Sequence, residues 1–450
     1  MRLRNLSVLG VSLILVAACG SNGATTPPST PAPAQSQGTQ SQAPASAPGG
    51  TVAIKVGIEL PMTGGEAPNG VPTANGVALA LSKITVPGFS ITIEQKDDAL
   101  NGKHDPQTGA ANMQALANDP QVLFVVGPYN SNVAQAEIPV SNAAGLMQCS
   151  PANTNPGLTK SWGGVDPTTL RPTHPDQIAY VRDATTDDLQ GAGGADIAAN
   201  IAHAKNAYVA DDTETYGKGI ADVFASTFPL FGGAVLKHDG IPDTTTDFTS
   251  YITALKGMTN LDYVYYGGVT TSGIGIFRSQ MASNSLANVP LGGGDGIVDG
   301  SAATASSYLN LAGSDGDANS YGTVAGPHDV SSDANPSQAD FATAYQAMFN
   351  TAPGAYSAAA YACTQVFLQA LQAVGPNDSG DLAKLRADVR AYVATPSNSY
   401  TTALGKFNFD AAGDTSQKIV SYYQYDPTSK DWKFLQQRDF SANPVPTAAP

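Results

Sequence analysis

Apolar residues recur with two different spacings after residue 51, and these spacings predict alternating strands and helices. Residues 52–58 alternate between apolar and other side chains as in a strand, and 122–126 is an unbroken apolar run, which is typical of a buried parallel strand. Glycine and proline punctuate residues 61–72 and predict a loop. Further strands are predicted at 91–93 and 146–150, and helices at 77–84, 106–118 and 132–143.

The same alternation starts again after about Asp188. Strands are predicted at 207–210, 235–239, 263–266 and 289–291, and helices at 195–204, 219–231, 248–256, 273–281 and 338–371. Three late segments predict antiparallel strands, at 406–409, 420–425 and 432–435. Two α/β halves imply two lobes with a cleft between them, each lobe a mostly parallel sheet with helices on both faces. Ligands of such sheets bind at the carboxyl ends of the strands.

The charge balance narrows the classes of partner. The chain of 450 residues has 22 Lys and Arg against 37 Asp and Glu, a net charge of −15. Without a positive excess to displace counterions from phosphates, the composition argues against a nucleic-acid-binding protein. Three cysteines are too few for a disulfide scaffold or a cysteine-rich metal site.

The first fifty residues predict export and a lipid anchor. Arg2 and Arg4 form a positive segment, and residues 6–16 are apolar but too short to span a bilayer. The tetrapeptide VAAC that follows resembles the bacterial lipobox, so we expect a signal peptide at 1–18 and an acylated Cys19. An ordinary secretory peptide with an incidental cysteine is the alternative. No charged or aromatic residue occurs from 20 to 50, and we expect a disordered tether over 19–50 that carries an extracytoplasmic body.

A series of short motifs, each weak alone, occurs in an order that resembles one protein family. The motifs are KDD at 96–98 with DP at 105–106, VVGPYNS at 125–131, SPANT at 150–154, YGKG at 216–219, DYVYYGG at 262–268 and DAAGD at 410–414. Over about residues 52–435 the chain resembles the extracytoplasmic leucine/isoleucine/valine-binding proteins. These are type I periplasmic binding proteins, the substrate-binding lipoproteins of ABC importers.

The resemblance implies how the chain is divided between two lobes. Lobe 1 would comprise residues 51–185 and 325–405, lobe 2 would comprise 186–324 and 406–440, and 441–450 would be a tail. The chain would then cross the hinge three times. The resemblance also implies a monomer without a cofactor, which closes on a small ligand and delivers it to the membrane permease subunits of an importer.

Five residues match ligand positions of the family, whose ligand is an amino-acid zwitterion. Ser131 and Thr154 match positions that hold the carboxylate. The Ala152 carbonyl and the Asp295 carboxylate would accept hydrogen bonds from the ammonium group, and Tyr216 would fold over the ligand.

Each of these residues also has a plainer interpretation. Ser131 could cap its helix, and Thr154 could hold its own loop through a local turn. Asp295 could be a turn residue in a glycine-rich run, and Tyr216 could pack at the rim of the lobe.

Several departures from the family pattern bear on the ligand. Asn69 and Val269 stand about where relatives carry aromatic side chains, and Asp295 is one methylene shorter than the glutamate that is usual there. The loop at 156–176 is longer than the family needs. We expect an amino acid, aliphatic or branched-chain, or a related small polar solute, and amides, urea-like solutes and aromatic acids remain open.

Cys149 and Cys363 both fall in the expected first lobe. Outside the cytoplasm two remaining cysteines favour a disulfide, two buried thiols are the alternative, and the spacing does not decide between them.

No motif in the sequence supports an enzyme. The chain lacks the phosphate-binding loop GxxxxGK[ST], the GxSxG nucleophile elbow and the HExxH zinc helix. Its five histidines are scattered without the spacing of metal ligands, so we expect neither catalytic residues nor a metal. A surface sensor built on the same lobes is the first alternative to an importer's receptor, and an amidase of the cleft is the second.

Overall fold

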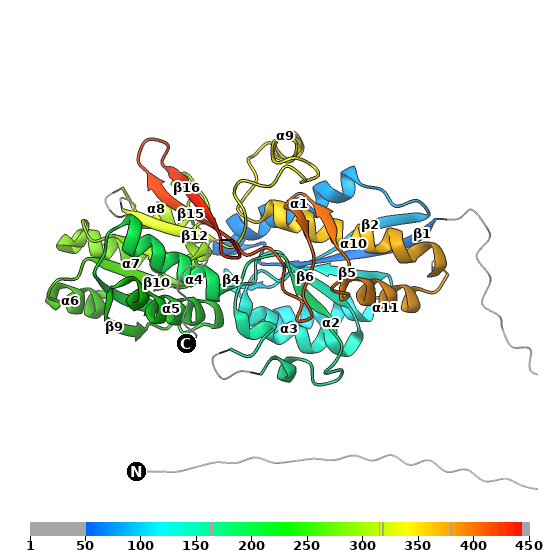
Figure 1. The fold of residues 1–450 in the computed structure, drawn as a ribbon, viewed down its shortest axis with the longest axis horizontal. Coiled ribbons are helices and arrows are strands. Elements are labelled where there is room, and N and C mark those ends of the chain that lie inside the picture. The colour runs from blue at the N-terminus through cyan, green and yellow to red at the C-terminus, as the bar shows by residue number, and fades with distance from the viewer. Residues whose placement is uncertain (1–50, 163–165, 315, 317–318, 379, 443–450) are drawn as a thin grey trace, which may run out of the picture. The chain divides into compact units, whose positions relative to one another are not determined.

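Two β-sheets, each with helices on both faces, form the part of the chain that the structure describes (Figure 1). The structure is a computed structural model, and it describes residues 51–162, 166–314, 316, 319–378 and 380–442. The expected α/β fold with two lobes is confirmed. The predicted signal peptide, Cys19, the tether and most of the predicted tail lie outside the described residues.

The first sheet is parallel throughout, with strand order β2-β1-β5-β6-β7. Its strands are β1 (Val52–Leu60), β2 (Phe89–Asp97), β5 (Val122–Val126), β6 (Met147–Ser150) and β7 (Tyr180–Arg182). Helices α1 (Ala67–Lys83) and α10 (Ser357–Asp378) pack on one face of this sheet. Helices α2 (Pro106–Asn118) and α3 (Ser131–Ala144) pack on the other face. Helix α11 (Leu382–Val393) packs against α10 and β5. Every residue of β5 is buried, which explains its unbroken apolar sequence.

The second sheet has strand order β16-β15-β12-β11-β10-β8-β9. The parallel strands are β8 (Asn206–Asp211), β9 (Ala234–Gly240), β10 (Tyr263–Gly267), β11 (Leu291–Gly293) and β12 (Ser320–Val324), and the antiparallel ones are β15 (Ile419–Asp426) and β16 (Asp431–Asp439). Helices α4 (Asp187–Asp196) and α5 (Thr215–Thr227) cover one face, and α6 (Thr249–Gly257), α7 (Ile274–Met281) and α8 (Tyr308–Ala312) cover the other. Successive residues of β10 pack on opposite faces, with Tyr265 against α5 and Tyr266 against α7.

The chain passes between the two sheets three times, after β7, after β12 and before β15. Hydrogen bonds join the three crossing segments. The Arg182 Nε donates to Asp414 Oδ1 at 2.7 Å, the backbone N–H of Thr185 donates to the Ala325 carbonyl at 3.1 Å, and the Thr185 hydroxyl donates to the Ile419 carbonyl at 2.8 Å. These bonds define the hinge between the sheets, while the residue boundaries of the two lobes stay a prediction.

The single helix expected over residues 338–371 is wrong, because two helices occupy this segment. Helix α9 (Gln338–Phe349) ends at Asn350, which adopts the left-handed conformation at φ 55° and donates its N–H to the Gln346 carbonyl. Pro353 follows before α10 begins at Ser357, and a proline has no N–H with which to continue a helix.

Two other sequence-based boundaries are also wrong. Residues 61–72 are not a loop throughout, since a short 3-10 helix (Gly64–Glu66) leads into α1 at Ala67. Pro68 lies in the first turn of α1, where the missing N–H of a proline has no helical partner to lose. The helix expected at 195–204 begins earlier, as α4, and continues as a π-helical turn (Ile197–Ile201).

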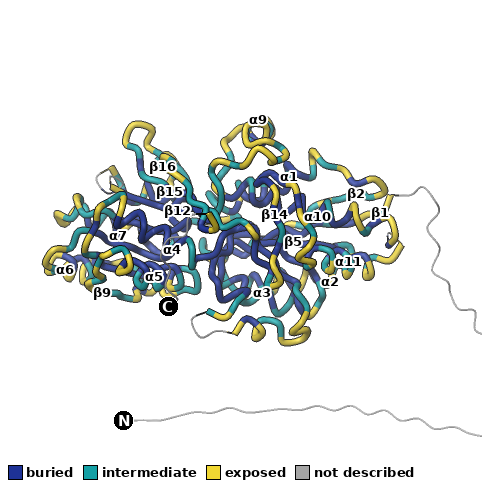
Figure 2. The backbone as a smooth tube through the Cα atoms, viewed as in Figure 1, coloured by how far each residue is buried: buried dark blue, intermediate teal, exposed yellow. Residues whose placement is uncertain are grey.

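Two short hairpins complete the fold. One pairs β3 (Ala99–Leu100) with β4 (Lys103–His104), and the other pairs β13 (Tyr400–Thr402) with β14 (Gly405–Phe407). Burial follows the two sheets, whereas most exposed segments are loops and outer helix faces (Figure 2). None of the helices in the described ranges is both long and apolar enough to cross a bilayer.

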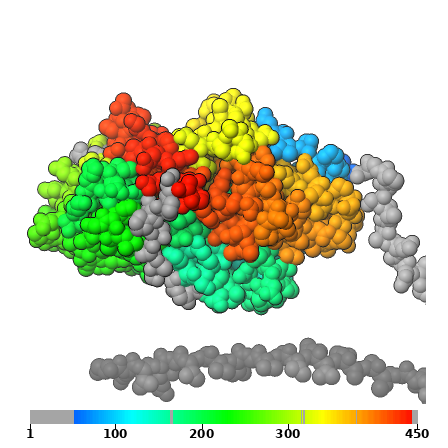
Figure 3. Space-filling model, viewed as in Figure 1, coloured from blue at the N-terminus to red at the C-terminus, as the bar shows by residue number. Residues whose placement is uncertain are grey.

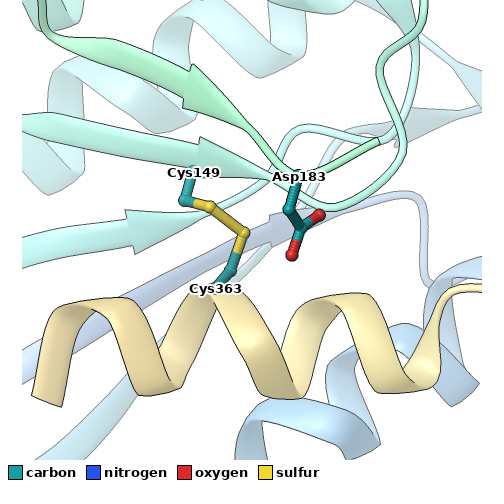
Figure 4. A group of neighbouring side chains, drawn as sticks. All are labelled: Cys149, Asp183 and Cys363. Atoms are coloured by element: carbon teal, nitrogen blue, oxygen red, sulfur yellow. A yellow bond between two sulfur atoms is a disulfide. The ribbon is translucent and has the colours of Figure 1, made fainter. Parts of the chain in front are cut away.

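A disulfide joins the end of β6 to the middle of α10 (Figure 4). The Cα atoms of Cys149 and Cys363 are 5.7 Å apart, and both side chains are fully buried. The bridge closes a loop of 214 residues that contains all of the parallel part of the second sheet. The disulfide therefore links β6 of the first sheet to α10, which packs on that sheet, although the parallel strands of the second sheet lie between them in the sequence.

Removal of this bridge should lower the stability of the fold. A Cys149→Ala/Cys363→Ala variant is expected to lose about 2–5 kcal/mol of unfolding free energy, because the open chain gains conformational freedom when it unfolds. Urea titrations of the variant and of the wild type, the latter with and without a reductant, measure the loss. Unchanged midpoints in both comparisons would contradict a stabilising disulfide.

Candidate functional site

Loops from both sheets meet around a small cavity at the carboxyl ends of their strands. Its volume is about 20 Å³, which is room for about one water molecule. Its walls consist of Tyr129, Asn130, Ser131, Ala152 and Thr154 beside the first sheet, and Tyr216, Val269, Asp295 and Gly296 beside the second. The structure thus brings all five sequence-predicted residues together, while their contact with a ligand stays a prediction.

Ser131 is the first residue of α3 and lies at the cavity wall. Asn130 occupies the N-cap position and makes no side-chain capping bond, so the interpretation of Ser131 as a helix cap is wrong. The Ser131 side chain is buried, and its hydroxyl accepts a long hydrogen bond from the Asn155 N–H at 3.4 Å. Backbone N–H groups at the start of a helix have no helical acceptors and favour an anion. This wall can therefore bind a carboxylate.

Thr154 lies in the loop after β6, and its hydroxyl is available for a ligand. Its Oγ1 is buried and has no hydrogen-bond partner among the described residues, so the interpretation as a local turn is wrong. The Asp187 carboxylate lies near this hydroxyl but without hydrogen-bond geometry, while the Asp187 N–H donates to the Thr154 carbonyl at 2.8 Å. A buried hydroxyl without a partner is unfavourable, and a ligand oxygen at this position would satisfy it.

Asp295 follows β11 and places an almost fully buried carboxylate at the opposite wall. Its Oδ1 accepts hydrogen bonds from Gln190 Nε2 and Tyr216 OH, both at 2.7 Å, and its Oδ2 accepts one from Tyr356 OH at 2.8 Å. Burial raises the pKa of Asp295, and these three hydrogen bonds lower it only in part. A carboxylate has roughly four acceptor positions, so one remains for a cationic donor.

The glycines around Asp295 allow close approach of the backbone to Tyr216. A Cβ at Gly294 would lie 2.2 Å from Tyr216 OH, and one at Gly296 would lie 2.3 Å from the Gly268 carbonyl oxygen. The Tyr216 hydroxyl also accepts the Gly296 N–H at 3.2 Å. Asp295 is thus more than a turn residue, and Tyr216 points into the site rather than packing only at the rim.

Sequence reasoning missed several residues of this site, among them Tyr129, Gln190 and Tyr356. Tyr129 stands inside the motif at 125–131 and packs edge-to-face on Tyr356, with ring centroids 5.7 Å apart. Gln190 and Tyr356 are separated from Asp295 by 105 and 61 residues and stand in no motif. Asn69, by contrast, lies in α1 and is not part of the cavity wall, whereas Val269 is.

The second-sheet side of the site carries several buried carboxyl groups without a cationic partner. Burial, and then the charge of Asp295, raises the pKa of Asp187 well above its ordinary value. Burial raises the pKa of Asp299 to about 7 and that of Asp212 to about 6. Within the described part of the chain, no lysine or arginine forms a salt bridge with any of the carboxyl groups of Asp187, Asp212, Asp295 and Asp299. A cation bound at the cavity would stabilise the ionised forms of these groups.

Polar contacts at the rim connect the two sheets' loops. Glu66 Oε1 accepts hydrogen bonds from His104 Nδ1 at 2.6 Å and from the Thr271 hydroxyl at 2.8 Å, and Asn132 Nδ2 donates to Glu214 Oε2 at 2.7 Å. Burial lowers the pKa of His104, but the charge and hydrogen bond of Glu66, together with the charges of Glu214 and Asp212, outweigh burial and the net shift is upward. Burial raises the pKa of Glu66, and His104 reverses that shift to a net decrease. The described conformation is thus one in which the lobes are closed on each other.

One cluster with the spacing of metal ligands occurs in the described residues, namely Cys149, Asp183 and Cys363 (Figure 4). Both sulfur atoms belong to the disulfide, so they are not available to a metal ion.

Comparison with known proteins places these features in a family. A family model described as periplasmic binding protein matches residues 53–429. The Leu/Ile/Val-binding protein homolog 1 of Brucella melitensis is 29% identical over 382 residues, which cover 83% of this chain and 90% of the relative. The family model covers all of the first sheet except Val52, the second sheet up to β15, and the residues of the cavity wall.

Solved structures share the fold at lower sequence identity. The leucine-binding protein LivK of Thermotoga maritima superposes with a TM-score of 0.70 at 22% identity, covering 86% of this chain and 99% of that one. A solute-binding protein of an ABC transporter from R. palustris in complex with 4-hydroxybenzoate also has a TM-score of 0.70, at 19% identity and with 86% and 97% coverage. The resemblance drawn from the sequence is therefore confirmed: the chain belongs to the periplasmic binding protein family, in the type I group that includes the Leu/Ile/Val-binding proteins.

Proposed function

We propose that the protein is the extracytoplasmic solute-binding lipoprotein of an ABC importer and captures a small amino acid by closure of its lobes. The observation that carries the proposal is the composition of the interlobe cavity. Donors for a carboxylate, at Ser131 and Thr154, lie on one wall, and an acceptor for an ammonium group, Asp295, lies on the other. Relatives named as Leu/Ile/Val-binding proteins support an aliphatic amino acid.

The charge of the site favours an amino acid over an aromatic acid. A benzoate-type ligand, as in the R. palustris complex, carries a negative charge and no ammonium group. In this chain it would meet the buried carboxylate of Asp295 without a compensating cation, and like charges in a low-dielectric site repel strongly. An α-amino acid brings its own cation and forms an ion pair with Asp295.

A thermal-shift screen across amino acids, amides and benzoates tests the ligand class. A ligand at a hundred times its Kd stabilises the folded state by about 2.7 kcal/mol, so an α-amino acid should raise the melting temperature and benzoates should not. Stabilisation only by solutes that lack an ammonium group would refute the amino acid while leaving the receptor fold intact.

Substitution of Asp295 tests the role of its charge. Asp295→Asn should weaken binding of the amino acid by about 2–5 kcal/mol, because the ammonium group loses a buried counter-charge. Ser131→Ala should have a smaller effect, about 1–3 kcal/mol, since it removes one hydrogen bond to a charged group. Glu137→Gln is the matched control, because Glu137 is a buried carboxyl group on α3 outside the cavity wall. Calorimetry measures the three affinities, and equal losses at 295 and 137 would contradict the assignment.

The rim contacts support closure of the lobes and predict how stability depends on pH. The pKa of His104 is raised, so its contribution to folding is complete below its ordinary 6.5 and lost as the pH rises through the folded value. The pKa of Glu66 is lowered, so its contribution is complete above its ordinary 4.5 and lost as the pH falls. The pair therefore stabilises the folded state most between these two values.

Glu66→Gln should consequently lower the melting temperature more at about pH 5.5 than at about pH 8.5. Melting curves of the wild type and the variant at both pH values measure the difference. Glu94→Gln is a control on β2, since Glu94 pairs with Lys55 and Lys96 and not with a histidine. The same loss at both pH values would contradict a charged Glu66–His104 pair.

The lipid anchor is a separate part of the proposal. It rests on the lipobox-like tetrapeptide that ends at Cys19 and on the uncharged segment that follows it. Cys19→Ala should release the protein from membranes without changing its melting temperature, because a segment of this composition is expected to contribute nothing to the core. Membrane fractionation and mass spectrometry of the mature N-terminus check this expectation. An unmodified N-terminus elsewhere in the wild type would refute it.

A further inference from the structure

A second, larger cavity lies beside the hinge, away from the interlobe cavity. Its volume is about 270 Å³. It lies between α9, the start of α10, the β13–β14 hairpin and the crossing segment after β12. In the space-filling view, α9 (yellow) stands next to the C-terminal segments coloured orange and red (Figure 3). A cavity of about 150 Å³ holds benzene in another protein, so this one has room for a ring with a short substituent.

The wall is apolar apart from a few polar groups. Among its residues are Pro327, Phe341, Tyr356, Leu404 and Tyr423. Besides tyrosines, three polar side chains line it, those of Asp183, His328 and Gln338. The His328 ring stacks on Phe434, and its Nδ1 contacts Tyr423 OH at 3.1 Å. Among the described residues, no lysine or arginine lines the wall. Its chemistry therefore suits an apolar body without a negative charge.

Asp183 is the one carboxylate in this wall, and it lacks a partner. Its side chain is 2% exposed, and neither of its oxygens has a hydrogen-bond partner among the described residues. Burial alone raises its pKa well above the ordinary value, with no neighbouring cation to oppose the shift. An isolated buried carboxylate is unfavourable unless it is protonated or meets a cation from outside. Asp183 contributes to the wall of the adjacent cavity, but both of its carboxylate oxygens are buried and one lies within 4.8 Å of the Cys149 and Cys363 sulfur atoms (Figure 4). A cation in the cavity therefore reaches the carboxylate after the Asp183 side chain rotates toward the cavity.

From this geometry we propose that the hinge cavity is a second binding site, which takes a small organic cation with a primary ammonium group and an aromatic or branched apolar body. The ammonium group pairs with Asp183, and the apolar body packs between Phe341, Tyr356 and Leu404. The site is distinct from the interlobe cavity, since the two walls share no residue.

The two sites are nevertheless adjacent through Tyr356. The ring of Tyr356 forms part of the hinge cavity, while its hydroxyl donates to Asp295 in the interlobe site and accepts the Ala325 N–H at 3.4 Å. Two of the three crossing segments, at Asp183 and at Val324–Gly326, also contribute to the wall. A cation in the hinge cavity therefore contacts the segments that move when the lobes open and close.

Binding of benzylammonium and of its neutral analogue benzyl alcohol tests the proposal, with Kd values from calorimetry on the full extracytoplasmic chain. The wild type should bind the amine at least about tenfold more tightly, because an ammonium–carboxylate hydrogen bond is stronger than a neutral one. In Asp183→Asn this preference should disappear while the affinity for the alcohol stays the same. An unchanged preference for the amine in Asp183→Asn would overturn the proposal.

Two further variants separate this site from the interlobe site. Asp295→Asn should leave the preference for the amine intact, and its loss in that variant would place the cation in the interlobe cavity and overturn the proposal. Ala342→Phe on α9 adds bulk to the wall and should weaken both probes. Folding of Asp183→Asn is not expected to suffer, because the substitution removes a buried charge without a partner, and its melting temperature verifies this.

Discussion

The buried guanidinium of Arg182 is the group on which the hinge and the ligand loop both depend. It donates to Asp414 in another crossing segment, to the Asn155 carbonyl at 2.7 Å and to the Thr159 hydroxyl. Burial raises the pKa of Asp414, but the charge and hydrogen bond of Arg182, with smaller contributions from Lys160 and Thr159, bring it below its ordinary value, so the pair is ionised. Loss of either partner would leave an uncompensated charge in the interior and release the loop that carries Thr154.

Around this fixed centre, the cleft combines many carboxylates with few cations. Asp414 has its arginine and Glu66 has its histidine, whereas Asp187, Asp295 and Asp299 have only neutral donors or none. Buried carboxylates that lack a counter-charge lower the stability of the empty protein, and a cation that binds beside them recovers that free energy. Because buried carboxyl groups outnumber cations in the cleft, the charge of a ligand should affect its affinity more than its shape does.

The sequence predicted the parts of the fold that have a local cause. The apolar run at 122–126 is buried on both faces of the first sheet. The motifs at 125–131 and 150–154 led to Ser131 and Thr154 through their resemblance to the family, and each residue follows a parallel strand. The local sequence pattern did not predict residues that are brought to the site by distant contacts. Tyr356 stands just before α10 and reaches Asp295 because α10 packs on the first sheet. The sequence spacing between the two residues gives no sign of this contact. The break after α9 was missed because helical periodicity outweighed the left-handed turn at Asn350.

The size of the interlobe cavity adds a constraint on how a ligand can enter. About 20 Å³ is far less than an amino acid occupies, and the hydroxyls of Tyr216 and Tyr356 already bind the carboxylate of Asp295. In the closed, empty site three neutral donors thus occupy acceptor positions of Asp295, while the Thr154 hydroxyl has no partner among the described residues. A ligand must then bind while the lobes are apart and offer Asp295 a charged donor at its remaining acceptor position. That contact gives the ligand a differential affinity for the closed state, which is what a binding protein needs in order to shift its population on capture.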